Sequence, residues 1–364
     1  MKTLDKIQNL VLEAIEDGAF PGANYAIIFK DKAYVNSLGN KALFPNVEKN
    51  DLNTIYDMAS LTKVICTTTA ILQLMEEGKL RLANPIKKYL PDFPYENMTV
   101  FDMVTHTSGL YPDVFNVSKL KSEAQFWEQA YTMGLKDEKN KRIIYSDIGF
   151  AILGKVIEVI SKQPLNEYVS EHIFKPLNMA DSGYLPKDVS RCAPTEDRND
   201  EMYQGILRGK VHDETAYCLG GVAGHAGLFS TISDVVKFVQ MIMNNGTLNG
   251  VKILSKASID ALYRPLVEDK NGNMIEGERR TIGWINRTNN GPSGDLTSHN
   301  TILHTGFTGT NIWIDRDNEI GFAMLTNRVH PTRGNGKHIE VRARLANFIM
   351  AHLEELKEEI KGSN

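Results

Sequence analysis

The chain has 364 residues, of which 42% are hydrophobic, and a formal net charge of −4. This length and composition allow a substantial buried core in one large domain or two smaller ones. The small net charge and the absence of a long basic run argue against a nucleic-acid-binding protein. The three cysteines form no C-x-x-C pair, so neither a disulfide framework nor a zinc ribbon is indicated.

The first 20 residues predict an amphipathic helix, because apolar Leu4, Ile7, Val11 and Ile15 recur at helical spacing among charged residues. The segment has no uninterrupted apolar stretch followed by a small-residue cleavage site, so it does not resemble a signal peptide. No later segment approaches the length of apolar sequence that spans a bilayer. We therefore expect a cytoplasmic protein without a membrane segment.

Residues 24–39 predict a β-hairpin, since β-branched and aromatic residues flank the polar turn Lys30-Asp31-Lys32. Helical periodicity then dominates from Ser60 to about residue 265. Strand-like runs return afterwards at 281–288, 301–306 and 310–327. A helix at 337–359 closes the chain. Strands at both ends and helices between them predict one sheet built from the two termini, with a mostly helical lobe inserted.

This pattern favours a single domain over residues 1–364. We expect its α/β lobe to comprise 1–58 and 275–364, and its helical lobe to comprise 59–274. Within the helical lobe, Thr231 and Asp234 are spaced as the reciprocal pair that opens a helix.

The chain contains the pattern S-x-x-K twice, at Ser60-Lys63 and at Ser118-Lys121. Ser118 lies in a polar, charged segment that predicts the start of a surface helix. Ser60 instead precedes small and apolar residues, and side chains three apart on a helix face the same way. A desolvated lysine there can accept the proton of the serine. A helix-capping serine with a chance lysine explains this motif equally well when it is taken alone.

Two further motifs fit a site near Ser60. Tyr145 and Asp147 directly precede a helical run, where a loop between lobes can present them. A strand leads into His304-Thr305-Gly306, and glycine there permits close approach of the backbone to a ligand. A turn at Gly306 and a structural histidine at 304 are the simpler interpretations of this third motif.

Metal and nucleotide sites have little support in the sequence. His212, Asp213, Glu214 and His225 are the nearest approach to a ligand cluster, but their spacing matches no common metal motif. No phosphate-binding glycine loop is present. We expect neither a metal nor a cofactor.

In chain order, Ser60-x-x-Lys63, Tyr145-Ser-Asp147 and His304-Thr305-Gly306 resemble the three active-site elements of the serine β-lactamase-like family. This family includes class C β-lactamases, D,D-peptidases and related esterases. Its fold is an α/β (α+β) antiparallel sheet flanked by helices. Two departures stand out: histidine replaces the usual lysine of the third element, and Asp147 replaces the commoner asparagine. Asp147 introduces a carboxylate that can pair with Lys63 and keep it charged.

The resemblance covers nearly the whole chain and includes "MVTHTSGL" at 103–110 and "GGVAGHAGLFSTISDVVKF" at 220–238. Among branches of the family, the sequence is most similar to bacterial cell-wall N-acetylmuramoyl-L-alanine amidases and the penicillin-binding protein 4B group.

The resemblance implies acyl transfer through a covalent intermediate. Ser60 would attack a carbonyl carbon, and Lys63 with Tyr145 would manage its proton. The backbone N–H groups of Ser60 and Phe307 would form the oxyanion hole. The substrate would be oriented by Asp147, His304, Thr305 and Gly306.

The expected function is therefore serine hydrolysis of an amide or ester bond, with a small muropeptide fragment as the favoured substrate. A carboxylesterase acting on small esters is one alternative. A catalytically silent protein that binds cell-wall fragments is another, because Asp147 departs from the family pattern. Neither nucleic acid nor membrane is an expected partner, and the sequence carries no signal for oligomeric state.

Overall fold

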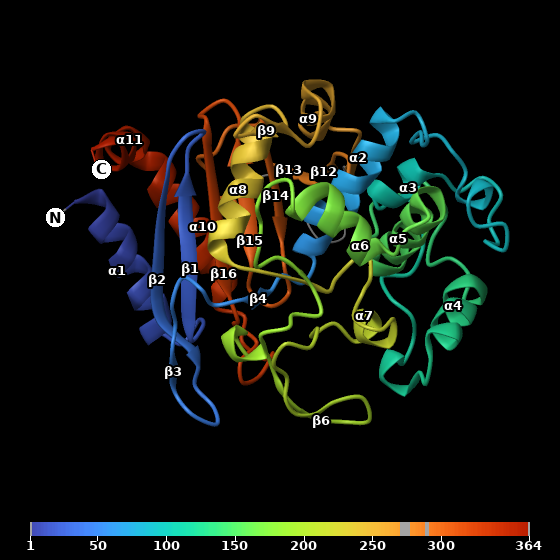
Figure 1. Cartoon of the computed structure of the whole chain (residues 1–364), viewed down its shortest axis with the longest axis horizontal. Helices are drawn as coiled ribbons and strands as arrows, with labels where there is room; N and C mark the ends of the chain where they lie inside the picture. Colours follow the sequence, from blue (N-terminus) through green and yellow to red (C-terminus); the bar gives the residue numbers. More distant parts are fainter. Residues whose placement is uncertain (1, 270–276, 288–290, 363–364) are drawn as a thin grey trace.

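The computed structural model describes residues 2–269, 277–287 and 291–362. Its centre is a nine-stranded antiparallel sheet, which runs through the middle of Figure 1. From one edge to the other, its strands are β11 (Val267–Asp269), β12 (Glu278–Arg280), β13 (Ile285–Asn286), β14 (Thr301–Thr305), β15 (Asn311–Asp315), β16 (Ile320–Thr326), β1 (Gly22–Ile28), β2 (Ala33–Ala42) and β3 (Glu48–Lys49).

The remaining strands form three small antiparallel sheets. These are β4 (Tyr56–Asp57), β8 (Leu228–Ser230) and β5 (Gly183–Tyr184); β6 (Asp197–Asn199) and β7 (Gln204–Ile206); and β9 (Thr247–Leu248) and β10 (Val251–Lys252). The α-helices are α1 (Thr3–Glu16), α2 (Thr69–Glu76), α3 (Val100–Val104), α4 (Glu123–Thr132), α5 (Asp147–Ser161), α6 (Leu165–Val169), α7 (Glu214–Cys218), α8 (Ile232–Met243), α9 (Lys256–Leu262), α10 (His338–Ala351) and α11 (Leu353–Lys361).

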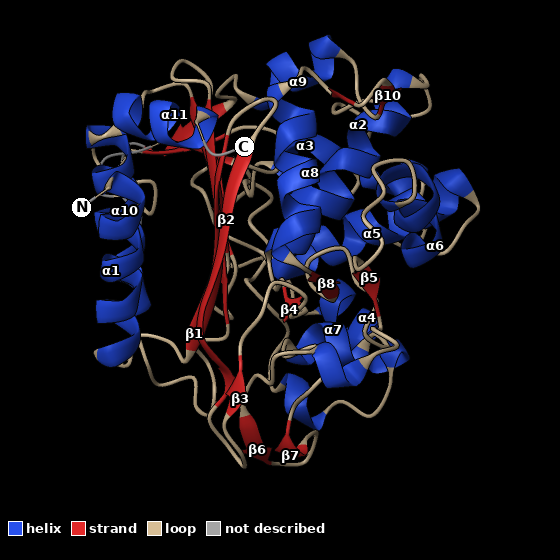
Figure 2. Cartoon of the chain, turned by 60° about the vertical axis from the view of Figure 1, so that its left-hand side comes forward, coloured by secondary structure: helices blue, strands red, loops and turns tan. Residues whose placement is uncertain are grey.

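Helices cover both faces of the large sheet. The terminal helices α1, α10 and α11 lie along one face, and α8 with the helical lobe lies on the other (Figure 2). Side chains of a strand alternate between the two faces, and β16 shows this directly. Phe322 and Met324 belong to the core under the terminal helices, whereas Ala323 and Leu325 belong to the core shared with the helical lobe.

The predicted assembly of the sheet from both termini is confirmed. β1 pairs with β2 as the expected hairpin, and its other edge pairs with β16, where Ala26 lies opposite Ala323. β11 falls within 59–274, so this range supplies an edge strand as well as helices. The division of the chain into one domain with two lobes stays a prediction. Within the described residues, no helix combines the length and apolar character needed to cross a bilayer.

Three local predictions were wrong. The closing helix is interrupted at His352, whose backbone leaves helical geometry and whose Nδ1 lies 2.9 Å from the carbonyl oxygen of Phe348. Thr231 occupies the N-cap of α8, as expected, but its side chain makes no capping bond. The Asp234 carboxylate accepts from the backbone of Asp181, so the reciprocal pair does not form. Ser118 lies inside a short 3₁₀ turn, Val117–Lys119, and starts no α-helix.

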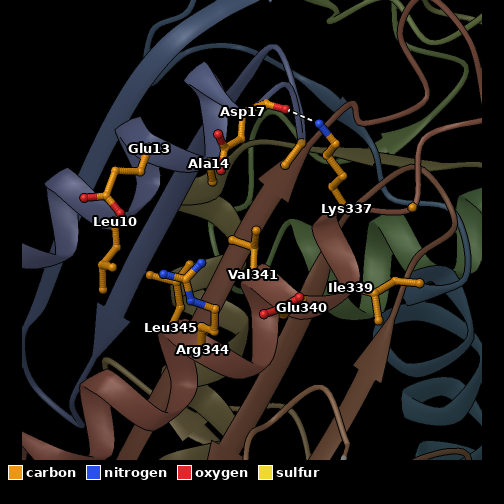
Figure 3. A pocket seen from close by; sticks show the side chains of 12 residues that line it. Leu10, Glu13, Ala14, Asp17, Lys337, Ile339, Glu340, Val341, Arg344 and Leu345 are labelled. Carbon is orange, nitrogen blue, oxygen red and sulfur yellow. Dashed lines mark hydrogen bonds between the residues drawn. The ribbon is translucent and has the colours of Figure 1, made fainter.

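A surface hollow opens between α1 and α10, on the outer layer of the molecule (Figure 3). Leu10, Lys337 and Arg344 are among its lining residues, and the lining contains no residue predicted for the active site. The candidate site lies elsewhere, where the large sheet meets the helical lobe.

Candidate active site

Ser60 follows strand β4 in a turn that the surrounding chain holds in place. The preceding residue, Ala59, has φ +47°, a left-handed conformation that residues with a side chain adopt only at a cost. The buried Asp57 carboxylate accepts the N–H of Ala59 (2.8 Å) and the N–H of His212 (2.7 Å). Thr308 Oγ1 donates to the Asp57 carbonyl (2.7 Å). These bonds position Ser60, which stays partly exposed, at the start of a helical segment.

Ser60 and Lys63 make the contact that their spacing predicts. Lys63 Nζ donates to Ser60 Oγ at 3.0 Å, and the lysine side chain is 0% exposed. The segment Lys63–Thr68 is π-helical and continues directly into α2. Single π-helical turns inside helices occur frequently at functional sites. Ser118 and Lys121, by contrast, form no side-chain hydrogen bond with each other within the described residues.

Three oxygen atoms surround the Lys63 ammonium group, which also interacts with the Tyr145 phenol. Besides Ser60 Oγ, they are the carbonyl oxygen of His225 at 3.1 Å and Asp147 Oδ1 at 2.6 Å. Burial lowers the pKa of Lys63, but the charge of Asp147 and the nearby Tyr145 phenol outweigh burial and raise this pKa above its ordinary value. Lys63 is therefore an ammonium ion in the resting protein, as the carboxylate at position 147 suggested.

Tyr145 lies beside this ion pair, on the loop that precedes α5. Its ring is stacked on His106, with 4.6 Å between ring centroids, and Lys63 Nζ is 4.8 Å from the ring centre. Burial raises the pKa of the Tyr145 phenol, and the opposing effect of Lys63 does not cancel this rise. The phenol is thus protonated near neutral pH. Asp147, two residues later, is the first residue of α5 and follows the N-cap Ser146.

His304 lies near the end of β14, 6.3 Å from Tyr145 between ring centroids. Its Nδ1 is 2.9 Å from the carbonyl oxygen of Thr305, so Nδ1 carries the proton and Nε2 is left as an acceptor. Burial, together with Lys63 and Arg280, holds the pKa of His304 well below its ordinary value. His304 is therefore neutral and offers a lone pair, whereas a lysine in this place would offer a charge.

The loop after β14 packs tightly against the turn that carries Ser60. A Cβ added at Gly306 would lie 2.1 Å from Thr310 Oγ1 and 2.6 Å from the Met58 carbonyl oxygen. The glycine thus makes room for the protein's own turn, and its place beside a bound substrate stays a prediction. Within the described residues, the N–H groups of Ser60 and Phe307 donate to no protein acceptor. Two free donors beside a serine are the arrangement an oxyanion hole needs.

The four residues considered as metal ligands bind separate partners, and Glu214 accepts from Arg333 Nη2 at 2.9 Å. His212 Nε2 is 3.0 Å from Glu196, and His225 Nε2 is 2.9 Å from Asp213. In the described part of the chain, no group of three or more histidine, cysteine or acidic side chains is arranged to hold a metal. His225 contributes to the site through its backbone carbonyl, which binds Lys63.

Sequence reasoning did not assign roles to two buried residues of this site. His106 supports the Tyr145 ring and accepts the Ser146 N–H at Nδ1 (3.0 Å). The Arg280 guanidinium lies 5.6 Å from the centre of the same ring. The segment 103–110 was recognised as similar to the family, but its pattern alone does not indicate that its histidine packs on Tyr145.

Asp113 supplies a stability prediction. Burial, together with Asp213 and Asp147, raises the pKa of Asp113 from an ordinary value of 3.8 to about 7. The folded protein thus holds this proton more tightly than the unfolded chain, so the stabilisation is complete below about pH 4 and is lost as the pH rises to 7. We expect Asp113→Asn to raise the melting temperature at pH 8, with a difference that shrinks toward pH 4. Equal differences in thermal melts at both pH values would contradict this.

Comparisons with known proteins agree with this geometry. A family model described as beta-lactamase matches residues 7–347. A Salmonella agona (strain SL483) protein named "Putative D-alanyl-D-alanine carboxypeptidase" is 30% identical over 349 residues, covering 86% of this chain and 78% of that protein.

Solved structures share the fold at lower identity. The hydrolase EstCE1, described as having promiscuous acyltransferase activity, superposes with a TM-score of 0.76 at 18% identity, covering 94% of this chain and 98% of that one. The octameric penicillin-binding protein homologue from Pyrococcus abyssi superposes with a TM-score of 0.72 at 21% identity, covering 96% and 77% respectively.

Proposed function

The chain belongs to the β-lactamase family, and on that premise we propose that Ser60 is the nucleophile with which it cleaves a peptidoglycan-derived fragment. Family and relatives make the protein a serine hydrolase acting on amide or ester bonds. The observation that carries the assignment to Ser60 is its hydrogen bond of 3.0 Å to a fully buried lysine. A serine and a proton-transfer group at this distance are the signature of an activated nucleophile.

In the proposed reaction, the Lys63–Tyr145 pair first loses one proton to solvent; Ser60 Oγ then attacks the substrate carbonyl carbon, and its proton passes to that pair. The carbonyl electron pair moves onto oxygen, where the N–H groups of Ser60 and Phe307 receive the negative charge. Collapse of this intermediate expels the leaving group and leaves an acyl-enzyme, which water then hydrolyses. His304 and Thr305 border the position of the substrate, His304 as a neutral acceptor.

The charge of Lys63 gives this mechanism a defined pH dependence. Lys63 accepts a proton only after losing its own, and the ion pair with Asp147 raises the pKa at which this happens. The Asp147→Asn variant removes the carboxylate, so the pKa of Lys63 falls. We expect the ascending limb of the kcat/KM profile to move to lower pH.

Rate measurements from pH 5 to 10 on wild type and Asp147→Asn check this prediction. The groups titrate together, so the apparent values belong to the Lys63–Tyr145–Asp147 set. An unchanged ascending limb in the variant would show that the carboxylate does not control the proton acceptor. Asp137→Asn, at a carboxylate paired with Arg142, is a suitable control.

The proposed substrate class comes from the relatives named for D-alanyl-D-alanine cleavage and from the branch resemblance to muramoyl-L-alanine amidases. Three substrates distinguish a peptidoglycan hydrolase from a carboxylesterase when their products are followed by mass spectrometry. They are a peptide ending in D-alanyl-D-alanine, N-acetylmuramoyl-L-alanine and a nitrophenyl ester. The proposal is supported if the wild type cleaves either peptidoglycan fragment and the Ser60→Ala variant does not. Cleavage of the ester alone favours a carboxylesterase.

The ion pair between Lys63 and Asp147 also supports a second candidate, a silent protein that binds cell-wall fragments. A lysine kept charged by its neighbour cannot take the serine proton, so chemistry would stop while the pocket remained. Binding of a muropeptide without turnover of any of the three substrates, from pH 5 to 10, would favour this candidate over the hydrolase.

A further inference from the structure

Two buried arginines lie beneath the loop that carries the second oxyanion-hole donor. Arg342, on α10, is 5% exposed, and its Nη2 donates to the carbonyl oxygens of Gly306 (3.2 Å) and Thr310 (2.9 Å). Arg328 is 7% exposed, and its Nε donates to the carbonyl oxygen of Phe307 (2.8 Å). The carbonyl oxygens of Gly306, Phe307 and Thr310 therefore each accept a hydrogen bond from a buried guanidinium.

Neither arginine has a carboxylate partner in ion-pair contact among the residues that the structure describes. Arg328 directs its Nη1 to the carbonyl oxygens of Arg333 and Asn335 instead. Burial and the neighbouring Arg328 lower the pKa of Arg342 to about 9, which leaves it charged at neutral pH. Burial and the same two arginines lower the pKa of His338 to about 3. This neutral histidine adds no charge. Arg328 also experiences the positive charge of Arg333 and the opposing charge of Glu196, whereas no acidic group is among the causes that shift the pKa of Arg342.

A buried charge without a counter-charge is costly to a folded protein, so its retention calls for a compensating interaction. The loop itself supplies only carbonyl dipoles. In the proposed reaction, the nearest negative charge to form is that of the tetrahedral intermediate, above the same loop. The buried Arg342 cation and this transient anion are electrostatically complementary.

Arg342 binds the carbonyl oxygen of Gly306, which is directly linked to Phe307. The Gly306 carbonyl and the N–H of Phe307 belong to the same peptide group. A charge-assisted hydrogen bond to the carbonyl oxygen draws electron density from that group and makes its N–H a stronger donor. We propose that Arg342 is a positioning residue which, through the Gly306 carbonyl, polarises the Phe307 N–H toward the oxyanion.

This inference rests on the proposed function, because it requires an acyl-enzyme at Ser60. It assigns no contact between Arg342 and the substrate. Arg342 holds the 306–310 loop against the Ser60 turn and raises the strength of one donor, while bond making and breaking stay with Ser60, Lys63 and Tyr145.

Infrared difference spectroscopy of the acyl-enzyme tests the inference. An aryl ester with a ¹³C-labelled carbonyl acylates Ser60, and the stretching frequency of the bound carbonyl falls as its hydrogen bonds strengthen. The variants are Arg342→Met, which removes charge and bonds, and Arg342→Gln, which keeps a neutral amide donor. Arg344→Met is the matched control, because Arg344 lies on the same helix and lines the hollow toward α1 (Figure 3).

We expect the carbonyl frequency to rise in Arg342→Met, to rise by a smaller amount in Arg342→Gln, and to match wild type in Arg344→Met. The acylation rate should fall about 10- to 100-fold in Arg342→Met, which is less than the roughly 100- to 1,000-fold loss on removal of an oxyanion-hole donor, because the Phe307 N–H is weakened and not removed. A role confined to stability would change the melting temperature and leave the carbonyl frequency unchanged.

An unchanged frequency in a folded, acylated Arg342→Met or Arg342→Gln protein overturns the inference while leaving the proposed function intact. If Arg342→Met does not fold, the same measurement is made on Arg342→Gln. A carbonyl frequency equal to that of wild type in Arg342→Gln would show that the charge of Arg342 is not needed. Absence of any acyl-enzyme in the wild type overturns the proposed function, and this inference with it.

Discussion

Replacing Ser60 with alanine is expected to lower kcat/KM by about 10⁴-fold or more, because the variant has no nucleophile to form the acyl-enzyme. The loss should appear in kcat, since the side chain lost is small and the pocket around it is unchanged. The melting temperature should stay close to that of wild type, because Ser60 is partly exposed and its side chain is small. Steady-state rates with the best substrate found above provide the measurement.

The chain supplies its own control in Ser118, which has the same S-x-x-K spacing. Ser118 lies in a 3₁₀ turn, and Lys121 is exposed, so Ser118→Ala should retain wild-type kcat/KM. A Ser60→Ala protein that keeps more than a tenth of wild-type activity would contradict the assignment. Loss of activity in Ser118→Ala alone would move the nucleophile to the other motif.

The second large effect is expected from Lys63→Met, which keeps the length of the side chain but removes its amine. The variant should acylate about 10³-fold more slowly, since proton transfer from Ser60 loses its acceptor and the Asp147 carboxylate loses its partner. Stopped-flow measurement of the burst with a nitrophenyl ester isolates this step from deacylation. Lys121→Met is the matched control.

A burst rate in Lys63→Met within tenfold of wild type would show that Tyr145 or water accepts the serine proton without Lys63. The double variant Lys63→Met/Asp147→Asn separates the two contributions. If part of the loss comes from an unpaired carboxylate, the double variant should acylate faster than Lys63→Met alone.

Those parts of the fold that rest on local periodicity could be predicted from the sequence. The hairpin of β1 and β2 follows from alternating β-branched residues around a polar turn, and α1 follows from Leu4, Ile7 and Val11 at helical spacing. The contact between Ser60 and Lys63 follows from the same geometry, since a separation of three residues places both side chains on one face. The pattern at 337–359 predicts one continuous helix, and helical spacing alone does not indicate the break at His352, where the side chain contacts the carbonyl oxygen of Phe348.

The rest of the site depends on contacts between distant segments, many of them through the backbone. The third partner of Lys63 is the carbonyl of His225, and every residue type carries such a carbonyl. His106 and Arg342 act through their packing on Tyr145 and on the 306–310 loop, which no spacing in the sequence encodes. The sequence could suggest the ion pair of Lys63 with Asp147, because Asp147 places a carboxylate where the family's second active-site element commonly has the amide of asparagine.

The central claim is that Ser60 is an activated serine, and the most direct test is the intact mass of the protein after exposure to a fluorophosphonate probe. Wild type and Ser118→Ala should each gain the mass of one probe adduct, while Ser60→Ala should gain none. No adduct on the wild type, or an adduct that persists in Ser60→Ala, would contradict the claim.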